Sequence, residues 1–413
     1  MKPRLPLLAL LALAPLGLAA RPDEPKPDAA LPSFRMQEVD KSLSVGYAVL
    51  LVDVDGDGKK DIVVVDTEQV VWYQNPSWKK RLITQKGQTA RDNVCIAAHD
   101  IDGDGKIDFA LGADWKPFNT QKGGTLQWLS RGKTLDEPWT VHPVGEEPTV
   151  HRIRFADVDG DGKPELIAVP LMGRNSSAKN NWTDGAPVRV LAYRIPKAPA
   201  RDRWVPETLD QSLHVVHNFY PVPAAGGRGS DILTASYEGV SRLSRGPDGK
   251  WGRKHLGAGN QANPKGSRGA SEVKQGRLRG GRKFIATIEP WHGNQVVVYT
   301  EPKESGQKLW DRHVIDEPVH WGHAVWCADL DGDGSDELII GERGLKKGGR
   351  CSVRVYKALD ERGTKWARKV IDDGGVAVED LAAADLDGDG KIDLVAVGRF
   401  TGNVRIYWNQ GRK

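Results

Sequence analysis

Four side chains able to bind a metal or transfer a proton recur at one position of a repeated pattern. His151, His323 and Glu379 each stand six residues before an acidic segment of nine residues, and His217 holds the same place in a copy that has lost its acids. Neutral imidazoles beside a carboxylate form sites for zinc or another divalent transition metal that keep an open coordination position. If the fold brings these positions together, the three histidines are the expected ligands, and Glu379 is a fourth ligand or a general base.

The acidic segments themselves have the composition of calcium loops. Five copies place Asp or Glu at positions 1, 3, 5 and 9, with glycines at positions 4 and 6 that permit a tight turn. Oxygen ligands at this spacing converge on one hard cation, as in the first part of an EF-hand loop, so we expect up to five structural calcium sites. The expected ligands are Asp53, Asp55, Asp57, Asp61, Asp100, Asp102, Asp104, Asp108, Asp157, Asp159, Asp161, Glu165, Asp329, Asp331, Asp333, Glu337, Asp385, Asp387, Asp389 and Asp393.

The repeats also predict the architecture that positions these residues. Apolar runs flank each acidic segment, which indicates a β-hairpin, and the 172 residues between the third and fourth copies leave room for two degenerate copies, at 226–235 and 279–288. Seven hairpins and seven outer strands that open with an aromatic residue predict an all-β fold, a seven-bladed β-propeller over residues 33–413. The first outer strand precedes the first hairpin, and the seventh hairpin has no outer strand after it. A strand at 33–40 is expected to complete the last four-stranded blade, which removes a free sheet edge.

A polar ring is expected around the mouth of the propeller opposite the acidic loops. Tyr47 stands at the ring position of the first blade, and Arg91 begins the loop that leads into the second. The turns between second and third strands, together with the segment VHWGH (Val319–His323), bring further polar and aromatic side chains to the same mouth. Tryptophan faces beside polar groups suit sugar rings, so the expected substrate contacts are Trp115, Trp291, Trp321, Arg343 and Arg399.

Composition and the N-terminal segment limit the possible partners and the cellular location of the protein. Fifty-nine basic and 55 acidic residues give a formal charge of only +4 in 413 residues, which does not favour a nucleic-acid partner. Residues 1–19 have the features of a signal peptide and residues 20–32 those of a Pro-rich lead-in, so we expect a secreted or periplasmic protein without a membrane span. The cysteines allow at most one disulfide and are Cys95, Cys327 and Cys351.

Two family resemblances add to these expectations. The DxDGDG hairpins resemble FG-GAP/VCBS repeats, which implies a propeller with calcium loops. The segments EPWHG (Glu289–Gly293) and VHWGH, with the seven-blade plan, resemble the propeller half of aldos-2-ulose dehydratases. That resemblance implies a metal-dependent lyase that removes water from a keto-sugar such as 1,5-anhydrofructose. It also implies that the three ring histidines bind the metal and that acid–base groups come from His292, His320 and Glu379.

Two functions remain open from the sequence. The first is an exported carbohydrate lyase or dehydratase that abstracts the proton beside a carbonyl and eliminates a β-substituent. The second is a non-catalytic propeller, stabilised by calcium, that binds a glycan or a protein through its tryptophans and arginines. The first predicts one transition metal shared by the ring side chains, and the second predicts calcium alone.

Overall fold

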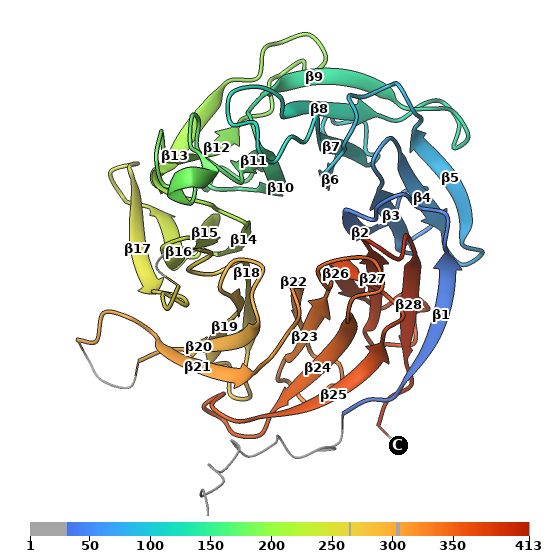
Figure 1. Ribbon diagram of the computed structural model, residues 1–413. Coiled ribbons are helices and arrows are strands. Elements are labelled where there is room, and N and C mark those ends of the chain that lie inside the picture. The colour runs from blue at the N-terminus through green and yellow to red at the C-terminus, as the bar shows by residue number, and fades with distance from the viewer. Residues whose placement is uncertain (1–30, 264–265, 303–305, 413) are drawn as a thin grey trace, which may run out of the picture.

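The structure is a computed structural model that describes residues 31–263, 266–302 and 306–412. Its strands form seven four-stranded antiparallel sheets, arranged as blades around a central axis (Figure 1). This arrangement confirms the predicted seven-bladed propeller. The expected signal peptide over residues 1–19 lies outside the described residues.

The blades share one order of strands from the axis outward. The innermost strands are β2 (Ala48–Val52), β6 (Cys95–His99), β10 (Val150–Ala156), β14 (Asn218–Pro223), β18 (Glu272–Arg277), β22 (Gly322–Ala328) and β26 (Val378–Ala384). The second strands are β3 (Asp61–Val65), β7 (Asp108–Ala113), β11 (Glu165–Pro170), β15 (Ser230–Ser236), β19 (Lys283–Glu289), β23 (Glu337–Glu342) and β27 (Asp393–Gly398). The third strands are β4 (Val70–Gln74), β8 (Thr125–Ser130), β12 (Val188–Tyr193), β16 (Gly239–Arg245), β20 (Gln295–Thr300), β24 (Ser352–Ala358) and β28 (Val404–Asn409).

The outer strands close the ring. They are β5 (Lys79–Thr84), β9 (Thr140–Glu146), β13 (Pro206–Leu213), β17 (Trp251–Gly257), β21 (Asp311–Asp316), β25 (Trp366–Asp373) and, in the last blade, β1 (Phe34–Asp40). Strand β1 pairs antiparallel with β28, with Phe34 opposite Asn409. The expected closure by the N-terminal strand is therefore confirmed. The one helical element among the described residues is the 3-10 turn η1 (Ala178–Asn180), and none of these residues forms a helix long and apolar enough to cross a membrane.

The core lies between neighbouring blades. Second strands such as β3 and β23 are buried along their whole length, which explains why they appear in the sequence as unbroken apolar runs rather than as alternating patterns. Outer-strand tryptophans pack inward: Trp139 lies 5.2 Å from Phe109 and Trp366 lies 5.3 Å from Phe284, measured between ring centroids. The cysteines are three free thiols.

The acidic segments form the turns between innermost and second strands. In the first, the two Asp53 carboxylate oxygens accept the backbone N–H groups of Gly56 at 2.7 Å and Gly58 at 2.8 Å. Both glycines have positive φ, 83° and 87°, a conformation that other residues rarely adopt. The Asp61 carboxylate closes the loop from the start of β3. Its burial there raises the pKa of Asp61 to about 6. Asp53, Asp55 and Asp57 place carboxylate oxygens close enough together to hold one cation.

The fourth acidic segment differs from the first in that side-chain cations lie among its carboxylates. The Lys357 ammonium lies 2.7 Å from Asp333 and 3.4 Å from Glu337, and it also pairs with Asp331. Arg412 pairs with Asp331 from the C-terminal segment, at 2.5 Å. The first loop instead receives a neutral donor, since the Gln74 amide bonds Asp55 at 2.6 Å. The five loops are therefore not electrostatically equivalent.

Candidate active site

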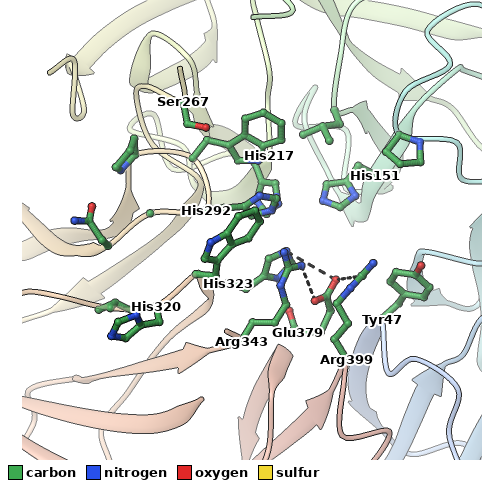
Figure 2. A pocket seen from close by; sticks show the side chains of 18 of the residues that line it. Tyr47, His151, His217, Ser267, His292, His320, His323, Arg343, Glu379 and Arg399 are labelled. Atoms are coloured by element: carbon green, nitrogen blue, oxygen red, sulfur yellow. Dashed lines mark hydrogen bonds and ion pairs between the residues drawn. The ribbon is translucent and has the colours of Figure 1, made fainter. Parts of the chain in front are cut away.

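A cavity of about 620 Å³ opens at the mouth of the axis where the innermost strands begin. Its wall combines the first residues of these strands with turns between second and third strands (Figure 2). The lining includes the expected residues Tyr47, Trp115, His151, His217, Trp291, His292, His320, Trp321, His323, Arg343, Glu379 and Arg399. The remaining expected residue, Arg91, is exposed and does not line this cavity.

Irregular pairing at the start of the innermost strands turns three of these side chains toward the axis. The register between innermost and second strands shifts across His151 in β10, across His323 in β22 and across Glu379 in β26. An inserted residue in an antiparallel pair bends the strand and re-aims a side chain, and such irregularities are common beside active sites. The same position of the repeat therefore points toward the axis in three different blades.

Three imidazoles converge at the centre of the cavity. His217, His292 and His323 place ring nitrogens within 4.8 Å of one another, and the Nε2 atoms of His217 and His292 are 3.1 Å apart. His217 Nδ1 lies 2.9 Å from Glu272 Oε1 and 3.2 Å from the Ser271 carbonyl oxygen. His323 Nδ1 lies 2.7 Å from the Glu379 carbonyl oxygen. Because these acceptors hold the Nδ1 protons, the Nε2 atoms of His217 and His323 carry the lone pairs.

The three rings are neutral near pH 7, which is the state that binds a metal. Burial lowers the pKa of all three histidines, most strongly for His292 and His323, where neighbouring positive groups lower it further. A divalent transition metal requires deprotonated imidazole, and zinc favours nitrogen ligands at three protein positions in catalytic sites. The residues present therefore fit a transition-metal ion. His292, expected in acid–base chemistry, lies in this group.

His151 lies beside the triad. Its ring centroid is 4.8 Å from that of His217, and Trp115 stacks on the His151 ring at 4.7 Å. Burial, with the adjacent Arg152 next in effect, lowers the pKa of His151 well below its ordinary value. Its Nε2 atom is buried and has no hydrogen-bond partner among the residues the structure describes. Arg152 lies 3.4 Å from its Nδ1 and can only donate, so in this arrangement the neutral ring carries its proton on Nε2.

Glu379 is a buried carboxylate held by two guanidinium groups. Arg343 donates to Oε2 and Arg399 donates to Oε1, both at 2.8 Å, and Oε1 lies 3.9 Å from His323 Nε2. Burial alone would raise the pKa of Glu379, but Arg343 and Arg399 together lower it. The side chain is therefore ionised, and its oxygens are engaged. Glu379 anchors the two arginines and, through its backbone carbonyl, the His323 ring.

Aromatic rings and unpaired donors form the outer wall. His292 lies between Trp291 and Trp321, with ring centroids 5.1 and 5.0 Å away, and the Arg343 guanidinium lies over Trp321 at 5.4 Å. Within the described residues, the buried Trp291 Nε1 and Arg343 Nε atoms have no hydrogen-bond acceptor. His320 is exposed at the rim, where its backbone N–H bonds Glu342. Such a wall suits a polar ring compound that stacks on tryptophan and whose oxygens accept hydrogen bonds from the free N–H groups.

Sequence reasoning missed the groups that orient His217. Ser271 and Glu272 belong to the fifth blade, whose acidic segment is degenerate, so no repeat position marked them. The cavity also contains Phe118, Leu171 and Met172, which are apolar and carry no motif. The pairing of Glu272 with a ring histidine was recognisable only after the strands were placed in space.

Comparison with known proteins finds that the sequence is similar to two families. The family model "Aldos-2-ulose dehydratase, beta-propeller domain" matches residues 123–302, and the FG-GAP-like repeat matches residues 53–111 and 329–396. Aldos-2-ulose dehydratase from Phanerodontia chrysosporium is 28% identical over 298 residues. That match covers 67% of this chain but 32% of the fungal protein, so the chain corresponds to about a third of that relative.

Solved structures support the fold alone. A crystal structure of BBS1N in complex with ARL6DN gives a TM-score of 0.53 at 14% identity and covers 92% of this chain and 97% of that one. Virginiamycin B lyase from Staphylococcus aureus gives a TM-score of 0.53 at 10% identity and covers 91% of this chain and 99% of that one. The protein is thus a seven-bladed β-propeller with FG-GAP-like repeats whose sequence is similar to the propeller domain of aldos-2-ulose dehydratase.

Proposed function

We propose that the axial cavity is the active site of a carbohydrate dehydratase, a carbon–oxygen lyase that removes water from a keto-sugar. One observation carries the proposal: three neutral imidazoles converge beside a fourth imidazole, whose Nε2 has no partner among the described residues, in a cavity walled by tryptophan. The similarity to the aldos-2-ulose dehydratase propeller supports the choice of sugar chemistry. In the reaction the C–H bond beside the ketone breaks, a C=C bond forms, and the β-hydroxyl leaves as water.

The metal and the anchoring groups have separate roles in this proposal. His217, His292 and His323 would hold zinc or another divalent transition metal, which when bound supplies Lewis-acid polarisation of a carbonyl oxygen. Glu379 keeps Arg343 and Arg399 in place, and the free Nε–H of Arg343 is a donor for a sugar oxygen. These fixed donors need no reorganisation as charge develops on the substrate.

Proton transfer is assigned to His151 and Tyr47. His151 accepts the proton from the carbon beside the ketone at Nε2 in the tautomer that carries its own proton on Nδ1, and this tautomer gives up the 3.4 Å contact from Arg152. Trp115 stacks on the ring and fixes its plane. Burial raises the pKa of Tyr47, so its phenol keeps a proton that it can donate from Oη to the departing hydroxyl. Water in the open cavity then returns a proton to Tyr47 and accepts one from His151.

The test joins metal analysis to turnover. The purified protein is incubated with 1,5-anhydrofructose and other keto-sugars, and loss of water is followed by mass spectrometry and by the absorbance of the unsaturated ketone. Wild type is compared with His217→Ala and with His142→Ala, a histidine on outer strand β9 that bonds Ser130. We expect about one transition metal per chain and turnover in wild type and in His142→Ala, and neither in His217→Ala.

Two results would overturn the proposal. A folded wild-type protein that holds calcium alone, with no transition metal, would remove the metal-dependent mechanism. Sugar binding that is equal in wild type and His217→Ala, without loss of water in either, would leave a glycan-binding propeller as the function. Circular dichroism of each variant shows whether a lost activity reflects the site or the fold.

A further inference from the structure

A second cavity, of about 520 Å³, lies deeper along the axis toward the acidic loops. All seven innermost strands contribute to its wall, and it shares no lining residue with the candidate active site. Four basic and two acidic side chains line it: Lys60, Arg152, Arg154, Lys274, Glu272 and Asp380. The cavity therefore has an excess of positive charge.

Two of its cations lack oxygen acceptors. Lys274 is only 5% exposed, and among the described residues its ammonium forms no hydrogen bond or ion pair. The ammonium lies between aromatic faces, 4.0 Å from the Tyr220 ring centroid and 4.5 Å from that of Trp326. Arg154 lies over Phe219 at 4.9 Å, and within the described ranges its buried Nη1 has no hydrogen-bond partner. Aromatic faces favour a cation but offer its N–H groups no oxygen.

The two carboxylates of the cavity do not pair with these cations. Glu272 receives the Asn218 amide on Oε2, and its Oε1 lies 2.9 Å from His217 Nδ1 but forms no hydrogen bond among the described residues. Asp380 accepts the backbone N–H of Val49 on Oδ2 and that of Leu381 on Oδ1, both at 3.0 Å. Neither carboxylate forms an ion pair with Lys274 or Arg154 among the described residues. The positive charge of these two side chains is therefore uncompensated at hydrogen-bond distance.

An uncompensated buried charge destabilises the folded protein unless a ligand of opposite charge binds. Burial, followed by the neighbouring Arg154, lowers the pKa of Lys274, which is the response of an ammonium that lacks a counter-ion. A bound oxyanion would accept hydrogen bonds from both cations. The volume is sufficient for an anion carried on a body the size of a monosaccharide, and the aromatic rings of Tyr220 and Trp326 would contact that body.

We propose that this cavity binds a small organic oxyanion, a carboxylate or a phosphate ester, through the Arg154 guanidinium and the Lys274 ammonium. The site is separate from the proposed dehydratase site and does not depend on its activity. Glu272 lines this cavity and lies 2.9 Å from His217 Nδ1, so one side chain separates the proposed anion site from the triad.

The test uses the whole protein and four defined probes. D-glucuronate and glycerol 3-phosphate represent the two oxyanions, glucitol is an uncharged sugar-sized compound, and chloride is a simple anion. Isothermal titration measures their affinity for wild type, Lys274→Met and Arg154→Met, with Lys283→Met as a matched control. Lys283 is an exposed lysine at the start of β19, so its charge lies outside the cavity.

We expect at least one oxyanion to bind wild type and Lys283→Met equally, and to bind Lys274→Met and Arg154→Met at least about tenfold more weakly, the loss that one charged hydrogen bond predicts. Glucitol should not bind. Preference for glucuronate or for glycerol 3-phosphate identifies the head group. Acylation of Lys274, followed by mass spectrometry, should slow when the oxyanion is present.

Several results would overturn the proposal. These are equal affinity in wild type and Lys274→Met, binding of glucitol as tight as that of either oxyanion, chloride competing at equal concentration, or no saturable binding of any oxyanion. Methionine has nearly the length of lysine and suits a buried site, so Lys274→Met should fold even if Arg154→Met does not. The conclusion therefore does not depend on both variants.

Discussion

The two cavities along the axis are built from the same innermost strands but differ in whether their buried charges are paired. In the outer cavity the imidazoles are neutral and the Glu379 carboxylate is matched by two arginines. In the inner cavity Lys274 and Arg154 meet aromatic faces but no oxygen acceptor among the described residues. The outer cavity thus offers neutral nitrogen atoms and a carboxylate that is already paired, whereas the inner cavity offers positive charge without an acceptor.

The difference shows how one strand serves two sites. Neighbouring residues line different cavities: His151 the outer and Arg152 the inner, and likewise Glu379 and Asp380. In β10 and β26 the pairing register shifts at this point, so the regular alternation of side chains is interrupted between the two cavities.

The largest expected effect is loss of the outer cation site. We predict that His292→Ala removes the transition metal and lowers turnover about 10²–10⁴-fold, because the triad loses one of three convergent nitrogens. His151→Ala should retain the metal and lose turnover, because its Nε2 is assigned to proton transfer. Elemental analysis beside turnover separates the two roles. Metal loss in His151→Ala with retention in His292→Ala would reverse our assignment.

The next effect concerns the charge balance around Glu379. Arg343→Met should lower the free energy of unfolding by about 1–3 kcal/mol, because a buried carboxylate loses one of its two charged partners. Arg350→Met is the matched control, since that arginine is 59% exposed and lies 4.0 Å from Glu342. Urea denaturation monitored by tryptophan fluorescence measures both. Equal destabilisation by the two changes would mean that the arginine pair does not anchor Glu379.

Sequence patterns predicted the blades and much of the outer cavity for one physical reason. Equivalent positions of a repeat become neighbours around an axis, so counting six residues back from each acidic segment identified His151, His217 and Glu379 as residues of one cavity. Arg91 was assigned from its place in a loop, without a repeat position, and it lies outside the cavity. The inner cavity was not predicted, because which face of β18 carries Lys274 depends on strand register that composition does not reveal.

A further prediction contrasts two acidic loops on the face behind both cavities. If the acidic loops hold calcium, as the sequence predicts, a chelator should lower hydrogen-exchange protection about tenfold in the β2–β3 hairpin, where four carboxylates receive no ammonium group among the described residues. The β22–β23 hairpin should change less, because Lys357 already lies among its carboxylates. Peptide-level mass spectrometry resolves the two hairpins. Equal loss of protection, or none in either, would contradict a calcium role that differs between loops.

The smallest effect tests the inner cavity without any ligand. Lys274→Met should raise the free energy of unfolding by about 1 kcal/mol near pH 7, because it removes a buried cation that lacks an ion pair. The folded pKa of Lys274 is lowered from 10.5, so below that pH the unfolded chain binds this proton more readily than the folded chain. Wild type therefore loses stability relative to the variant as the pH falls, and the difference disappears above pH 10.5.

The groups that face Lys274 define how this pH profile is read. They are Arg154 on β10, Glu272 on its own strand, Cys327 on β22 and Asp380 on β26, and burial raises the pKa of Asp380. All four groups remain in Lys274→Met. Subtracting the pH profile of its free energy of unfolding from that of wild type therefore removes the effect of their own titration in the unfolded chain. Lys283→Met should give a flat difference. A Lys274→Met difference that is equally flat from about pH 6 to about pH 10 would show that the ammonium is already compensated, and the inner cavity would then have no charge for an anion to satisfy.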